Sequence, residues 1–144
     1  MIFIKKHFPF LVLFLLLFSC TKQEKKGTEA TDLYADYIAK GSAKMSLNEH
    51  DSAFYYFNQA KLVCKKDDDK SIVYALLMMG GLQKNLADYA GVESSMTEAL
   101  KVVKDSTYYP YIYNLLGITY KEQYDYDSAL LYYTKSLKIA SDDY

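Results

Sequence analysis

Apolar residues recur every three or four positions from Leu33 onward, and the two-residue alternation of a surface strand is absent. This period is typical of helices that bury one face. The pattern, read with the turn and capping signals, predicts six helices in three pairs: 32–46 with 50–65, 70–86 with 89–104, and 108–123 with 126–141. We therefore expect an all-α fold.

The second helix of each pair carries one recurring pattern. HDSAFYYFNQAKLVC at 50–64 and YDSALLYYTKSLKIA at 126–140 both place Asp-Ser-Ala before aromatic residues, and LADYAGVESSMTEALKVV at 86–103 is a third copy. The copies are offset by 39 and 37 residues. A repeat of this length indicates stacked helical hairpins. The matched positions expected to pack between helices are Ala53, Phe57, Ala60, Met96, Ala99, Ala129 and Tyr133.

Each first helix carries a glycine at the same repeated position, namely Gly41, Gly80 and Gly117. A glycine inside a helix costs about 1 kcal/mol relative to alanine. Three glycines in matched places therefore need a packing reason. We expect the paired helices to cross closely there, with the small residues Ala53 and Ala129 on the facing helix.

The repeated pattern resembles the tetratricopeptide repeat (TPR), a helix–turn–helix unit that stacks into a superhelix. The third copy matches most fully, whereas Gln83 replaces an aromatic in the second, and Lys40 and Lys44 replace apolar residues in the first. The resemblance implies a TPR-type α–α superhelix within residues 32–144, with three repeats at about 34–66, 70–105 and 108–141.

In TPR proteins the first helices line a concave surface where peptides or helices of partner proteins dock. By position, the resemblance implies a groove of Tyr74, Leu77, Lys84, Asn85, Tyr111, Asn114 and Lys121, with Gly81 and Ile118 among them. Ile38 and Ser42 stand where chaperone-binding members carry a carboxylate clamp, so we do not expect that activity. The alternative for the polar members of this set is ordinary surface polarity.

The first 20 residues have another character: Lys5 and Lys6, then an apolar run from Phe8 to Phe18, then Ser19-Cys20. Eleven apolar residues make a helix about 16 Å long, against a bilayer core of about 30 Å. A cleaved secretory signal is therefore favoured over an uncleaved, tilted anchor. Leu17-Phe18-Ser19-Cys20 resembles the lipobox of bacterial lipoproteins. That resemblance implies a signal peptide at 1–19, acyl chains such as palmitate on Cys20, and a flexible tether across 20–31.

Charge and residue usage exclude several function classes. The chain has no arginine, and beyond Cys20 it has 15 lysines against 18 acidic residues, a net charge of about −3. Nucleic-acid binding needs clustered cations and is not expected. Because Cys20 is expected to carry the lipid, Cys64 has no second cysteine with which to form a disulfide. His50 occupies a core-type position of the repeat. We find no phosphate loop, metal-spaced pair or nucleophile elbow in the sequence, and expect neither an enzyme nor a cofactor or metal.

The last predicted helix ends at Ser141, where solenoids usually continue into a covering helix. Leu130, Leu131 and Leu137 are expected to be partly bare, and their cover to be a second copy, a partner or more of a longer protein. The functional expectation is a protein- or peptide-binding lipoprotein of the bacterial cell envelope. It would face the periplasm or exterior, with the outer membrane favoured. The alternatives are the sensory or regulatory input domain of a longer signalling protein and, third, a cell-wall accessory enzyme.

Overall fold

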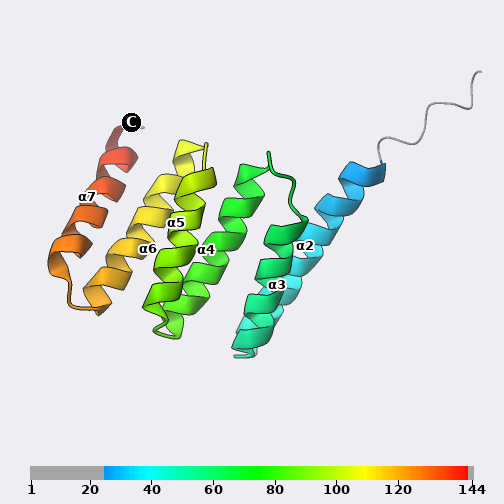
Figure 1. Cartoon of the computed structure of the whole chain (residues 1–144), viewed down its shortest axis with the longest axis horizontal. Helices are drawn as coiled ribbons and strands as arrows, with labels where there is room; N and C mark the ends of the chain where they lie inside the picture. Colours follow the sequence, from blue (N-terminus) through cyan, green and yellow to red (C-terminus); the bar gives the residue numbers. More distant parts are fainter. Residues whose placement is uncertain (1–24, 143–144) are drawn as a thin grey trace, which may run out of the picture.

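The computed structural model describes residues 25–142, and every regular element in that range is helical. Figure 1 shows the helices in order as α2 (Lys25–Ser46), α3 (His50–Val63), α4 (Asp69–Asn85), α5 (Tyr89–Val102), α6 (Tyr109–Glu122) and α7 (Tyr126–Asp142). A short 3₁₀ turn, η2 (Ser106–Tyr108), precedes α6. The prediction of an all-α fold with six helices is confirmed for these residues. The bounds from α3 onward lie within two residues of those expected.

The first helix is longer than the sequence pattern predicted. We expected a flexible tether across 20–31, but α2 begins at Lys25, so the segment 25–31 is helical. Lysine, glutamate and alanine in this segment are good helix formers, and apolar periodicity alone does not detect a helix with few apolar residues. The signal peptide at 1–19 and Cys20 lie outside the described residues. Within 25–142, no helix combines the length and apolar character that a bilayer crossing requires.

The helices pack as three pairs in a row, with α2 and α7 at opposite ends (Figure 1). Within each pair the two helices make the most extensive contacts, and α4 then packs on α3, and α6 on α5 and α4. One apolar core runs through the row. Its largest fully buried side chains are Phe57, Leu76, Leu82, Met96 and Ile112.

The repeated glycines each make room for a large side chain sixteen residues later. A Cβ placed on Gly41 would lie 2.5 Å from the ring of Phe57, and one on Gly117 would lie 2.7 Å from the ring of Tyr133. On Gly80 it would lie 2.8 Å from Cε of Met96. The nearest neighbours are therefore these large residues rather than Ala53 and Ala129, because helical side chains lean toward the N-terminus and cover the preceding turn.

The other predicted packing residues occupy the same interior. Ala53, Phe57, Ala60, Met96 and Ala99 have no exposed surface and Ala129 keeps 3% of its own, whereas Tyr133 is half-buried.

All three pairs use one turn geometry. Asn48, Ala87 and Tyr124 have φ of 58°, 57° and 65°, the left-handed region that most residues avoid. The next backbone N–H in each turn donates back to the carbonyl five residues earlier, at 3.0 Å for Glu49, 2.9 Å for Asp88 and 3.0 Å for Asp125. This bond closes a Schellman motif at the end of the first helix. The recurrence of the turn at the 39- and 37-residue offsets makes the three pairs structural repeats.

Candidate functional site

The implied groove residues lie on the outer sides of α4 and α6, which are neighbouring helices. Tyr74 and Tyr111 occupy equivalent positions and are 43% and 65% exposed. Lys84 and Lys121 are also equivalent, as are Leu77 and Asn114. Leu77 and Lys84 are half-buried, and Asn85, Asn114 and Lys121 are exposed. We call the set formed by Tyr74, Leu77, Gly81, Lys84, Asn85, Tyr111, Asn114, Ile118 and Lys121 the α4/α6 surface.

Gly81 leaves a stretch of helix backbone without a covering side chain in the middle of the α4/α6 surface. Gly81 is inside α4, and a Cβ placed on it would have no atom within 4 Å. Leu77 and Lys84 are one helical turn away on the same side. Gly81 therefore differs from Gly80, whose missing side chain is replaced by Met96. A helix-interior glycine without a packing role allows another chain to approach the backbone closely.

The cations of this surface are available to a ligand. Within the described residues, Lys84 and Lys121 form no ion pair, although four other lysines do: Lys40, Lys44, Lys61 and Lys70. A surface that carries both ammonium groups and exposed tyrosine rings suits a ligand that combines carboxylates with apolar side chains.

Gln83, where the repeat pattern led us to expect an aromatic, belongs to a polar network that is buried at Ser95 and reaches the surface at Asp88. Ser95 Oγ donates to Gln83 Oε1 at 2.7 Å, and Gln83 Nε2 donates to Asp88 Oδ2 at 3.5 Å. Asp88 Oδ1 also accepts from the Gly91 N–H at 3.0 Å and so caps α5. Since the network satisfies its own polar groups, we assign it to packing rather than to ligand binding.

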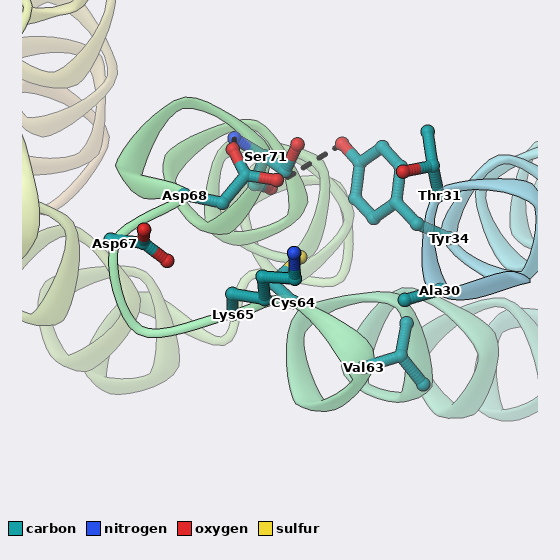
Figure 2. Close-up of a pocket in the computed structure, with 9 residues that line it drawn as sticks. All are labelled: Ala30, Thr31, Tyr34, Val63, Cys64, Lys65, Asp67, Asp68 and Ser71. Atoms are coloured by element: carbon teal, nitrogen blue, oxygen red, sulfur yellow. Dashed lines mark hydrogen bonds between the residues drawn. The ribbon is translucent and has the colours of Figure 1, made fainter. Parts of the chain in front are cut away.

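A pocket of about 270 Å³ lies where α2 meets the end of α3 and the start of α4 (Figure 2). Tyr34 Oη donates to the Ser71 carbonyl at 3.3 Å across it, and Cys64 Sγ donates to the Ala60 carbonyl at 3.2 Å. Burial, with the nearby Asp68 carboxylate, raises the pKa of the Cys64 thiol to about 11. A thiol is nucleophilic only as the thiolate, so Cys64 is unreactive near neutral pH. Sequence reasoning found Cys64 but not the pocket, whose walls are distant in sequence.

Among the remaining candidates for chemistry, the acidic run before α4 has a structural role. In the Asp67–Asp69 run, Asp68 accepts from the Ser71 N–H at 3.2 Å and caps α4, and Asp69 accepts from the Lys104 N–H at 3.0 Å. His50 Nδ1 is buried without a hydrogen-bond partner. Among residues 25–142, no three His, Cys, Asp or Glu side chains gather closely enough to hold a metal ion.

Comparisons of the chain with protein-family models, curated proteins and solved structures returned no match.

Proposed function

We propose that this chain is a lipid-anchored TPR protein of the bacterial cell envelope that binds a segment of a partner protein on its α4/α6 surface. The repeat offsets, the glycine positions and the three identical turns all support TPR-type hairpins. The leader and its Ser19-Cys20 site support export and acylation at Cys20, so that the partner would be another envelope protein.

The observation that carries the binding proposal is Gly81. Its open backbone lies between half-buried Leu77 and Lys84. A helix gains stability from alanine at such a position, so glycine is expected only where something else must fit. An extended peptide or a helix could lie along Gly81, pack apolar side chains on Tyr74 and Tyr111, and place a carboxylate near Lys84 or Lys121.

Site-specific photo-crosslinking in intact cells tests the binding proposal. A photoreactive amino acid replaces Tyr74 or Lys121 in the α4/α6 surface, and Tyr55 on α3, which is 56% exposed, is the control. We expect a discrete crosslinked protein from the first two positions and none from the control. Gly81→Ala should weaken the crosslink while leaving the helical content unchanged. Equal crosslinking from all three positions, or none from any, would refute a binding role for this surface.

Metabolic labelling tests the anchor separately. Cells fed labelled palmitate should label the native chain, and Cys20→Ser should abolish the labelling. Cys64→Ser is the matched control, because the Cys64 thiol is half-buried and bonded to the backbone. Labelling that survives Cys20→Ser would refute acylation at this site without bearing on peptide binding.

A further inference from the structure

The outer side of α7 repeats the face that joins one hairpin to the next. Applying the repeat offsets to α3, α5 and α7 aligns one stripe on each helix. The stripes are Phe54, Phe57, Lys61 and the C-cap Cys64 at α3; Glu93, Met96, Leu100 and the C-cap Val103 at α5; and Leu130, Tyr133, Leu137 and Ala140 on α7. No member of the first two stripes is exposed. On α7, Leu130 is 67% exposed, Leu137 is 70% exposed, and Ala140 is exposed as well.

The stripes of α3 and α5 are covered by contacts with the core and with other helices. Gln123, just after α6, donates to Glu93 at 3.5 Å. A Cβ on Gly80 would touch both Met96 of α5 and Leu115 of α6. Phe54 and Leu100 pack against the core. Both stripes are thus covered where another hairpin follows, and the α7 stripe, which we call the open face, is their equivalent that no described residue covers.

The opposite end of the row, formed by α2, presents a polar rather than an apolar surface. The side of α4 away from α6 carries Ala75, Met79 and Leu82, and the equivalent residues of α6 are Ile112, Leu116 and Thr119; all six are buried. In α2 the equivalent positions hold Asp36, Lys40 and Ala43, which are all exposed. Lys40 Nζ and Asp36 Oδ2 form an ion pair at 2.7 Å. Covering this pair with an apolar helix would remove its solvation, so α2 does not complement the open face.

We propose that two copies of this chain associate through their open faces, with α7 against α7. Because the two ends of one row do not match, head-to-tail stacking is disfavoured, whereas an apolar stripe complements itself across a two-fold axis. In an antiparallel arrangement centred on the stripe, Leu130 of one copy packs beside Ala140 of the second copy, and Tyr133 beside Leu137. The antiparallel helix dipoles add to this preference. The α4/α6 surfaces stay uncovered, so the dimer would offer two binding surfaces.

Sedimentation velocity of the full chain, extracted from membranes in mild detergent, tests the association. We expect a dimer for the native chain and at least a 100-fold higher dissociation constant for Leu130→Glu/Leu137→Glu, since each leucine contributes roughly tenfold or more when buried. Leu62→Glu is the matched control, because Leu62 is 63% exposed on α3 outside the stripe, and it should remain dimeric. Both leucines are exposed in one copy, so circular dichroism should stay unchanged.

A monomeric native chain, an open series of larger species, or equal weakening by Leu62→Glu would each overturn the proposal. Thiol crosslinking locates the contact. In a Cys64→Ser background, Leu137→Cys should give a covalent dimer with a short bismaleimide, and Leu62→Cys should not. The Cys64→Ser parent reports any crosslink through Cys20. A dimer that crosslinks at position 62 but not at 137 would show that α7 is not the interface.

Discussion

Ser95 donates a hydrogen bond to the buried amide of Gln83 at the place where Tyr120 and Tyr132 stack in the next hairpin. The two tyrosine rings lie 5.4 Å apart and within 4° of parallel. Gln83 and Ser95 are 9% and 5% exposed, and their bond is 2.7 Å long. One pair of repeat positions is thus filled by a polar pair in the second hairpin and by an aromatic pair in the third.

Removing one partner of the polar pair should destabilise the protein. Ser95→Ala leaves Gln83 Oε1 buried without a donor, so we expect the free energy of unfolding to fall by about 1–3 kcal/mol. Ser95→Ala combined with Gln83→Leu should recover most of the loss, because no buried polar atom is then stranded. Urea denaturation monitored by circular dichroism measures both. A double variant less stable than Ser95→Ala would contradict this account.

Two glycines should respond to alanine in opposite directions. At Gly41 the new Cβ would meet the fully buried ring of Phe57, and we expect a net loss of about 1–3 kcal/mol from overpacking. At Gly81 nothing lies within 4 Å, and we expect a gain of up to about 1 kcal/mol from helix propensity. Thermal and urea unfolding of the two variants give the signs. Destabilisation by Gly81→Ala would mean that this position is packed.

The left-handed turn at Ala87 offers a stabilising change. Its φ of 57° is strained for alanine and free for glycine, so Ala87→Gly should raise the free energy of unfolding by about 0.5–1 kcal/mol. Ala39→Gly, in an exposed part of α2, is the control and should lower it by about 1 kcal/mol. Equal losses in both variants would argue against the turn geometry.

Acid should weaken the link between α4 and the turn before α6. Lys70 and then Thr107 donate hydrogen bonds to the Asp105 carboxylate and lower its pKa from 3.8 to about 2. A carboxyl group with a lowered pKa stabilises the fold above its unfolded pKa, and this contribution disappears as the pH falls from about 4 to about 2. Melting temperatures should therefore drop more steeply in that window for the native chain than for Asp105→Asn. An NMR titration should find the Asp105 midpoint near 2, and Lys70→Ala should raise it.

Cys64 should resist alkylation while the protein is folded. With its pKa raised to about 11, little thiolate is present at pH 8, so iodoacetamide should react much more slowly than with a free cysteine, whose pKa is about 8.5. Unfolding in urea should restore the ordinary rate. Mass spectrometry of the intact protein measures the rate of alkylation. Rapid modification of the folded chain would show that the pocket opens readily.

Periodic apolar positions, read with the turn and capping signals, predicted six helices and most of their bounds, since both kinds of signal are local and detectable in the sequence alone. The turns were not predictable in detail: Asn48, Ala87 and Tyr124 adopt one conformation without sharing a residue type. The repeat register separates the adjacent glycines at 80 and 81, but the close contacts of Gly80 with Met96 and Leu115 and the open space at Gly81 came only from the structure. The pairing of Gln83 with Ser95 likewise depends on how two helices face each other. The implied groove residues of the α4/α6 surface stay a prediction.

The ion pair of Asp36 with Lys40 also limits how such an array can lengthen. A duplicated hairpin placed after α7 could pack on the apolar open face of α7. The same hairpin placed before α2 would have to bury two charges, so insertion there would require simultaneous substitutions at both positions. An engineered family built on this chain should therefore be elongated at its α7 side alone, with the α2 hairpin kept as a fixed, water-compatible terminus.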